Sequence, residues 1–257
     1  MTPPLLETRA LTKRFGGLVA VNAVNLVVPK GKITAIIGPN GAGKTTYFNC
    51  LTGIGPATGG DVVWKGQTTT RNPPHVMARM GMARTFQNIR LFDGMTCAEN
   101  VIVGGHCRTR SGVLGAVLRL AATRAEERAS RDKAMDLLDF MGLARWAGEN
   151  AMGLSYGDRR RLEIARALAV EPELLLLDEP AAGMNPKETG DLEGIVQRIL
   201  ERGVTVLLIE HHMKFVMNIS DHIAVLDHGL KIAEGPPLEI RRNPKVIEAY
   251  LGPDAII

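Results

Sequence analysis

The order of apolar and polar positions predicts alternating strands and helices. Residues 5–28 alternate apolar and polar in two runs, and we expect two antiparallel strands joined near Gly16–Gly17. Residues 32–37 are mostly apolar, which is typical of a strand whose two faces are both covered. A glycine-rich loop over 38–43 and a helix over 44–51 are expected next. This order of strand, loop and helix is the one that a phosphate-binding loop requires.

The middle of the chain changes to a helical pattern. From Thr96 to about Ala169, charged residues separate apolar residues at helical spacing, as at Ala125, Ala129, Met135, Leu138 and Met141. We therefore expect a helical subdomain inserted into one domain, not a second domain joined by a linker. Residues 111–120 are expected to pack within this subdomain, and a contact with a membrane partner is the alternative.

Strand patterns return in the last third of the chain. The expected elements are strands at Leu174–Leu177 and Thr205–Ile209, helices at 186–201 and 244–251, and a strand pair within 222–233 that turns at 227–229. Alternating strands and helices of this kind predict a mostly parallel α/β sheet.

Composition favours a globular protein of the cytosol. Of the 257 residues, 45% are hydrophobic and 23% are charged, which argues against a disordered chain. No run approaches the roughly 20 apolar residues that cross a bilayer, and the N-terminus lacks the pattern of a secretory signal. The three cysteines contain no C-x-x-C pair, so neither a disulfide framework nor a zinc site is expected. The net charge of +4 comes without a dense basic stripe, so no nucleic-acid partner is expected.

The strongest chemical signal follows the first buried strand. The pattern G-x-x-x-x-G-K-[ST] is matched by Gly38, Pro39, Asn40, Gly41, Ala42, Gly43, Lys44 and Thr45. Glycines let successive N–H groups turn toward phosphate oxygens, and the next helix points its positive dipole end at the same anion. Lys44 can reach the β- and γ-phosphates, and the Thr45 hydroxyl can bind Mg²⁺. The sequence therefore predicts a site for ATP and Mg²⁺, which Thr46 extends.

A second signal is the acidic pair that ends the strand after residue 173. Asp178 lies where a buried strand delivers its carboxyl end, a place from which it can hold Mg²⁺. Glu179 follows and can orient or polarise the attacking water as a general base. Together with the phosphate loop, this pair predicts a nucleotide hydrolase.

The segment Leu154–Asp158 and the helix after it resemble the signature segment of ABC ATPases. Ser155 and the Gly157 backbone precede a helix, which suits a further phosphate. The resemblance implies that Ser155, Tyr156 and Gly157 complete the nucleotide site of an opposite subunit, in trans. Tyr156 stands where glycine is commoner in the family, and Asp158 stands where glutamine is commoner.

Other family positions follow in order along the chain. The resemblance implies that Phe15 stacks on adenine, that Gln87 senses the γ-phosphate and Mg²⁺, and that His211 contacts the γ-phosphate. Catalytic roles are thus expected for Glu179, His211, Lys44 and Gln87, and metal binding is expected for Thr45, Gln87 and Asp178. His212 occupies a place where the family usually has aspartate, so its role is left open.

The resemblance covers essentially the whole chain. It implies an α/β fold of the P-loop NTPase type: an ABC ATPase nucleotide-binding domain with an antiparallel β subdomain and an inserted helical subdomain. Residues 1–257 would form one domain, with 1–95 and 170–257 as the core and about 96–169 as the helical subdomain.

Three further segments are similar to the ATPase subunits of branched-chain amino-acid importers. They are residues 84–92, the loop 181–186 and the ending 243–252, and the length of 104–129 fits the longer of the two kinds of subunit. This implies an ATPase that dimerises with a like or related subunit. It would drive integral-membrane permeases at the cytoplasmic face of the inner membrane and serve a solute-binding protein indirectly.

The alternatives are an ABC ATPase for another solute, such as a urea or amide importer or a lipid-linked exporter, and a soluble ABC ATPase of ribosomes or DNA. A small-molecule kinase with a phosphate loop is disfavoured by the signature segment.

Overall fold

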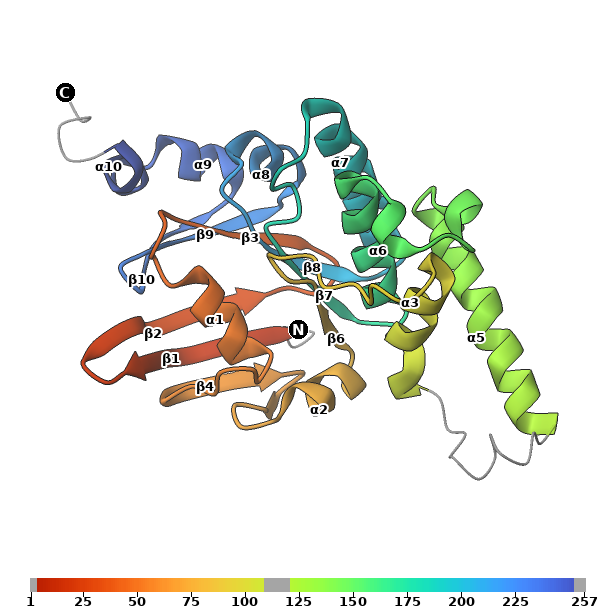
Figure 1. Cartoon of the computed structure of the whole chain (residues 1–257). Helices are drawn as coiled ribbons and strands as arrows, with labels where there is room; N and C mark the ends of the chain where they lie inside the picture. The colour runs from red at the N-terminus through yellow and green to blue at the C-terminus, as the bar shows by residue number, and fades with distance from the viewer. Residues whose placement is uncertain (1–3, 109–120, 252–257) are drawn as a thin grey trace.

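The computed structural model describes residues 4–108 and 121–251 and contains two sheets (Figure 1). The larger has the strand order β10-β9-β3-β8-β7-β6. Its strands are β10 (Leu230–Gly235), β9 (His222–Asp227), β3 (Ile33–Ile37), β8 (Thr205–Ile209), β7 (Leu174–Asp178) and β6 (Met82–Arg84). The pairs from β9 to β6 are parallel, and β10 pairs antiparallel with β9. The predicted, mostly parallel α/β sheet is therefore confirmed.

The smaller sheet is antiparallel. It has the order β2-β1-β4-β5, with β2 (Leu18–Val28), β1 (Leu6–Phe15), β4 (Gly59–Trp64) and β5 (Gln67–Thr68). The predicted strand pair over 5–28 is β1 and β2, whereas β4 and β5 fall in a stretch for which the sequence pattern predicted nothing.

Helices occupy the intervals between strands. They are α1 (Lys44–Leu51), α2 (Pro74–Arg79), α3 (Cys97–Gly104), α5 (Ala121–Phe140), α6 (Tyr156–Leu168), α7 (Pro186–Glu201), α8 (Met213–Ile219), α9 (Pro237–Arg242) and α10 (Pro244–Leu251). Short 3₁₀ turns lie at Gly105–Arg108, Ala144–Trp146 and Ala151–Gly153. Within the ranges 4–108 and 121–251, no helix is both long and apolar enough to cross a membrane.

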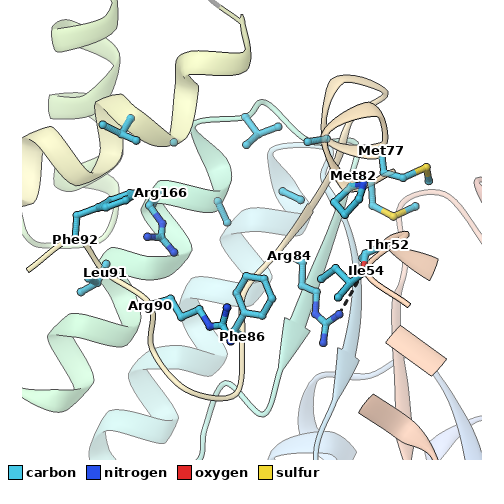
Figure 2. Close-up of a pocket in the computed structure, with 17 residues that line it drawn as sticks. Thr52, Ile54, Met77, Met82, Arg84, Phe86, Arg90, Leu91, Phe92 and Arg166 are labelled. Carbon is cyan, nitrogen blue, oxygen red and sulfur yellow. Dashed lines mark hydrogen bonds between the residues drawn. The ribbon is translucent and has the colours of Figure 1, made fainter. Parts of the chain in front are cut away.

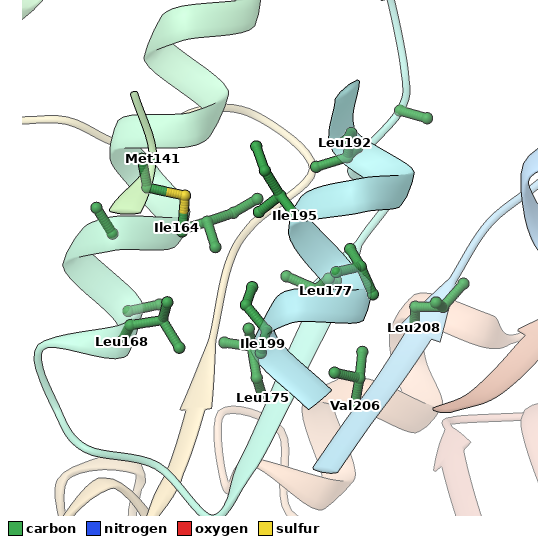
Figure 3. Close-up of a cluster of buried hydrophobic side chains, with 14 of the residues drawn as sticks. Met141, Ile164, Leu168, Leu175, Leu177, Leu192, Ile195, Ile199, Val206 and Leu208 are labelled. Atoms are coloured by element: carbon green, nitrogen blue, oxygen red, sulfur yellow. The ribbon is translucent and has the colours of Figure 1, made fainter. Parts of the chain in front are cut away.

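The central strands are apolar throughout because both faces of the larger sheet are covered. Leu175, Leu177, Val206 and Leu208 pack against α6 and α7 on one face, as Figure 3 shows. Their strand neighbours, such as Leu176, point to the other face and pack with α1 and the smaller sheet. Every residue of β3, β7 and β8 is buried. This two-sided burial explains the continuous apolar runs.

Helices α3, α5 and α6, which we call the helical group, pack on one another at the side of the molecule opposite the smaller sheet (Figure 1). The predicted apolar face of α5 was partly wrong: Ala125, Ala129 and Met135 are exposed. Leu138 and Met141 are buried as expected, together with Ala134 and Leu137. The error arises because several rotations of a helix fit a sequence rich in alanine and charge. The prediction for 111–120 lies outside the described residues.

Candidate functional site

The loop 38–43 joins β3 to α1, and its glycines are required by close packing. Gly38 has φ 151°, and a Cβ there would lie 2.0 Å from the Leu226 carbonyl oxygen of β9. Gly43 has φ 96°, and a Cβ there would lie 2.2 Å from the Ala20 carbonyl oxygen of β2. Side chains at these two positions would push the loop away from both strands. The loop is therefore held against the backbone on two sides.

Lys44 begins α1 and folds back into this loop. Its ammonium donates hydrogen bonds to the carbonyl oxygens of Gly38 (2.6 Å) and Pro39 (2.8 Å). Burial lowers the pKa of Lys44, and the nearby carboxylates of Glu179 and Asp178 oppose this shift. The loop thus surrounds a desolvated cation at the N-terminal end of a helix, an environment that favours a phosphate anion.

Asp178 ends β7 with its carboxylate buried. The Oδ2 atom accepts a hydrogen bond from Arg84 Nη2 at 2.7 Å, and both side chains are nearly inaccessible to solvent. Within the described residues, the buried Oδ1 atom has no hydrogen-bond partner. A buried carboxylate oxygen without a donor is a good candidate for a cation ligand.

Glu179 is the point at which three distant segments meet. Its Oε2 accepts a hydrogen bond from Gln87 Nε2 at 3.0 Å and lies 3.7 Å from His211 Nδ1. The residue has a left-handed φ of 47°, and its N–H donates to the Ile209 carbonyl oxygen at 2.9 Å. Positive φ in a residue other than glycine is a strained conformation that occurs often at functional sites. The geometry brings together the predicted Glu179, Gln87 and His211.

Glu210 belongs to the same region and was missed by the sequence reasoning. It is fully buried; its Oε1 accepts from the Ala181 N–H at 2.8 Å. Its Oε2 accepts from the N–H groups of His211 and His212 at 3.0 and 3.1 Å. One carboxylate therefore joins the loop after Glu179 to the histidine segment. An acid directly after the buried strand β8 is the signal that could have revealed it. His212 caps α8, and its side chain is exposed.

The signature segment lies apart from the phosphate loop. Ser155 caps α6: its Oγ accepts from the Asp158 N–H at 3.2 Å and donates to Asp158 Oδ2 at 2.9 Å. Tyr156 is 41% exposed, and Gly157 is buried against Glu188. In Figure 1, α6 stands with α3 and α5, whereas α1 lies beside the smaller sheet. Ser155, Tyr156 and Gly157 are thus remote from the loop of their own chain.

The segment that carries Gln87 is fastened to α6. Arg160 donates to the carbonyl oxygens of Phe86 (2.7 Å) and Gln87 (2.8 Å). Glu163 accepts from the N–H groups of Phe86 and Arg90, each at 3.3 Å. Both side chains are buried and pair with each other at 2.8 Å. The position of Gln87 therefore depends on the helix that the signature segment begins.

A groove of about 550 Å³ lies next to this segment, between α3 and α6 on one side and α2, β6 and the residues that follow α1 on the other. Figure 2 shows Arg84 and Arg90 on either side of the Phe86 ring in its wall. The centres of the two guanidinium groups lie 5.3 and 4.8 Å from the ring centroid. Most of the other lining residues are apolar.

The remaining predicted residues lie at the edges of the site. Phe15 ends β1 and is 55% exposed, with the Lys13 ammonium 5.0 Å from its ring centroid. Thr45 is exposed, and Thr46 is half-buried in the first turn of α1. Two of the predicted residues, Phe15 and Thr45, are thus open to a ligand that approaches from solvent.

Comparison with known proteins identifies the family. A family model described as "ABC transporter" matches residues 21–182, and one described as "Branched-chain amino acid ATP-binding cassette transporter" matches 231–253. The chain is 50% identical to the high-affinity branched-chain amino acid transport ATP-binding protein BraF of Pseudomonas aeruginosa, covering 98% of this chain and 99% of that protein. It is 48% identical to LivG of Escherichia coli K12, with the same coverage.

Solved structures agree with this assignment. The crystal structure of the ADP conformation of an ATP-binding cassette of an ABC transporter is 35% identical to this chain, with a TM-score of 0.85. The match covers 98% of this chain and 100% of that structure. A nucleotide-free ATP-binding cassette from an ABC transporter has a TM-score of 0.84 at 33% identity, covering 96% and 98% of the two chains. The chain belongs to the ATP-binding proteins of the ABC transporter family.

Proposed function

We propose that this chain is the ATP-binding, ATP-hydrolysing subunit of an importer of branched-chain amino acids. The observation that carries the proposal is the meeting of Gln87, His211 and Glu179 around one carboxylate oxygen beside the Lys44 loop. The names of the relatives that are about half identical over nearly the whole chain support the solute class. They do not favour an ATPase of ribosomes or DNA.

In this proposal the loop 38–46 holds the phosphates of ATP through its N–H groups, and Lys44 neutralises the β- and γ-phosphates. Lys44 already donates to two carbonyl oxygens of the loop, so phosphate oxygens replace these partners without a large movement of the side chain. Phe15 stacks on adenine through its exposed ring.

The residues near Lys44 fit a Mg²⁺ ion. The test is the buried Asp178 Oδ1, which has no hydrogen-bond partner within the described residues and which a hard cation would satisfy. Thr45 and Asp178 would hold the ion, with Gln87 as a further oxygen ligand. When bound, Mg²⁺ offsets the negative charge that the phosphates carry.

Hydrolysis is assigned to the group around Glu179. Its carboxylate accepts a proton from the attacking water, which it also orients toward the γ-phosphate. Gln87 fixes the position of Oε2 through its 3.0 Å hydrogen bond. His211 Nδ1 lies 3.7 Å from the same oxygen and donates to the γ-phosphate from there.

We infer that the active form is a dimer with a like or related subunit. Ser155, Tyr156 and Gly157 lie at the start of α6 and remote from the loop of their own chain, so they are free to contact the ATP of a partner. ATP then joins two subunits, and its hydrolysis releases them. Movement of the helical group drives integral-membrane permeases at the cytoplasmic face of the inner membrane, and an extracytoplasmic solute-binding protein supplies the solute.

The experiment that tests this function compares Glu179→Gln with Glu201→Gln, an exposed carboxylate at the end of α7. We expect Glu179→Gln to lose at least about 100-fold in ATP turnover and to form a stable dimer in ATP and Mg²⁺. The control should keep normal turnover. Normal turnover of Glu179→Gln without dimers would contradict the assignment. Copurification with ribosomes or DNA, instead of permeases, would contradict the transport role.

A further inference from the structure

Arg84 lies beside the proposed nucleotide site with its side chain nearly buried, and its Nη1 and Nη2 atoms donate three hydrogen bonds. No role follows for it from the phosphate loop or the signature segment. It is the last residue of β6, whose partner strand β7 ends at Asp178. We propose that Arg84 is a positioning residue: it fixes the Asp178 carboxylate so that Oδ1 faces the metal. This inference rests on the proposed function, because it concerns the metal site of that function.

The guanidinium divides its donors between two elements. Nη2 donates to Asp178 Oδ2 at 2.7 Å, whereas Nη1 donates to Asn49 Oδ1 at 2.7 Å and to Thr52 Oγ1 at 3.2 Å. Asn49 lies in the last turn of α1, and Thr52 caps that helix. A cation is favourable at this negative end of the helix dipole. Arg84 therefore ties the far end of the phosphate-loop helix to the carboxylate that ends β7.

Two aromatic rings restrict the guanidinium further. Its centre lies 5.5 Å from the centroid of Phe48 on α1 and 5.3 Å from that of Phe86 in the groove wall (Figure 2). The Arg84 side chain is only 6% exposed, and the Asp178 side chain is only 2% exposed. Because the ion pair has so little access to water, its two side chains are fixed by a direct charged hydrogen bond and by close packing, in addition to their charge attraction.

The consequence for Asp178 is that its two oxygens become unequal. Oδ2 is used by Arg84, while the buried Oδ1 has no hydrogen-bond partner in the described part of the chain. Without the guanidinium, Asp178 Oδ2 would be buried without a partner, so nothing would hold the carboxylate in its present orientation. A rotated carboxylate would no longer direct Oδ1 toward the metal.

A second effect of Arg84 has the opposite sign. Its positive charge repels a nearby cation. If this charge were its only effect, removal of Arg84 would strengthen Mg²⁺ binding. The sign of the change in Mg²⁺ affinity therefore distinguishes a positioning residue from a competing charge.

The test measures binding of a fluorescent ATP analogue to the full chain, at increasing MgCl₂ and in EDTA. Arg84→Met keeps an unbranched apolar side chain next to the rings and removes the donors. We expect the Mg²⁺ concentration for half-maximal tightening to rise about tenfold in Arg84→Met, while the dissociation constant in EDTA changes by less than roughly twofold. Arg84→Lys should fall between the wild type and Arg84→Met, because it keeps the charge and loses the fork.

Two further variants keep the result interpretable. Asn49→Ala leaves Arg84 and Asp178 in place and removes one anchor, and it should raise the Mg²⁺ requirement by about threefold, even if Arg84→Met folds poorly. Arg90→Met removes the other guanidinium on Phe86, which has no bond to Asp178, and should leave the Mg²⁺ requirement unchanged. Thermal unfolding of each variant checks that it is folded.

An unchanged or lower Mg²⁺ requirement in folded Arg84→Met and Asn49→Ala would overturn the role of Arg84 alone. A wild-type chain that binds the analogue without any response to Mg²⁺ would contradict the proposed metal site and, with it, this inference.

Discussion

Arg160 and Glu163 lie one turn apart on α6, pair at 2.8 Å, and are both buried within the helical group. The other hydrogen bonds of these two side chains go to the backbone of residues 86–90 and to Tyr156. Glu163 also forms an ion pair with Arg166 at 3.9 Å. Most of the contacts of this pair are therefore made outside its own helix. The pair links the Gln87 segment to the helix that the signature residues begin.

Arg160→Met should destabilise the chain more than removal of both charges does. The single change leaves Glu163 buried without its partner and should lower the free energy of unfolding by about 3–5 kcal/mol. The double change Arg160→Met with Glu163→Met removes the unpaired charge and should recover about 2 kcal/mol of that loss. Denaturation in urea measures both. Arg161→Met, whose two ion pairs are longer and partly exposed, is the control and should change stability by less than about 1 kcal/mol.

The double variant of this pair also separates stability from function. If the Arg160–Glu163 pair positions Gln87, the double variant will recover part of the unfolding free energy but not its ATP turnover. Equal stability losses in the single and double variants would contradict the idea that an unpaired buried charge is the cause.

Gly43→Ala should weaken nucleotide binding. A Cβ at this position meets the Ala20 carbonyl oxygen at 2.2 Å, and the φ of 96° is unfavourable for alanine, so the loop must shift. We expect a loss of at least about 2 kcal/mol in unfolding free energy, together with weak binding of ATP. Calorimetry of unfolding and of nucleotide binding measures the two effects. Gly17→Ala has open space around its Cβ and should leave both unchanged. Tight ATP binding by Gly43→Ala would show that the loop tolerates this shift.

The sequence predicted the elements whose residue pattern follows directly from the burial or the backbone conformation of those same residues. β3, β7 and β8 are apolar throughout because each strand is covered on both faces, so the pattern reports burial directly. The loop between β3 and α1 was predictable because Gly38 and Gly43 occupy backbone conformations and contacts that only glycine permits. The short β6 offered only three residues and no such pattern.

Charged residues that become buried could not be predicted in the same way. Arg84 and Glu210 look like surface residues in the sequence, because burial of a charge depends on partners that the sequence does not place nearby. Arg84 meets Asp178 94 positions away, and Glu210 meets the Ala181 N–H 29 positions away. Their positions became evident only with the sheet that joins these segments.

The stability of the chain should depend on pH through Lys44. Burial lowers its pKa in the folded state below the usual value of 10.5. Between the folded and unfolded pKa values, the unfolded chain binds the proton and the folded chain does not, so stability rises with pH in that interval. Lys44→Met lacks this titration. We therefore expect the unfolding free energy of Lys44→Met, relative to that of the wild type, to be highest at neutral pH and to fall as the pH rises toward 10.5. Urea denaturation at several pH values measures the difference, and a constant difference would contradict the lowered pKa.

Glu210→Gln should impair hydrolysis without a change at any residue that touches the phosphates. The carboxylate accepts three N–H groups, from Ala181 on one oxygen and from His211 and His212 on the other. Glutamine keeps the shape but turns one acceptor into a donor, so at least one side loses its partner. We expect a loss of about 1.5–3 kcal/mol in unfolding free energy.

Because the same carboxylate sets both His211 and the loop after Glu179, ATP turnover by Glu210→Gln should also fall, by about tenfold, with ATP binding changed far less. Glu193→Gln is the matched control: its carboxylate accepts from Asn218 at the exposed surface of α7 and should affect neither property. Steady-state turnover and equilibrium binding of ATP measure the two effects. If turnover by Glu210→Gln stays normal although its stability falls, Glu210 only supports the fold, and His211 is positioned by other contacts.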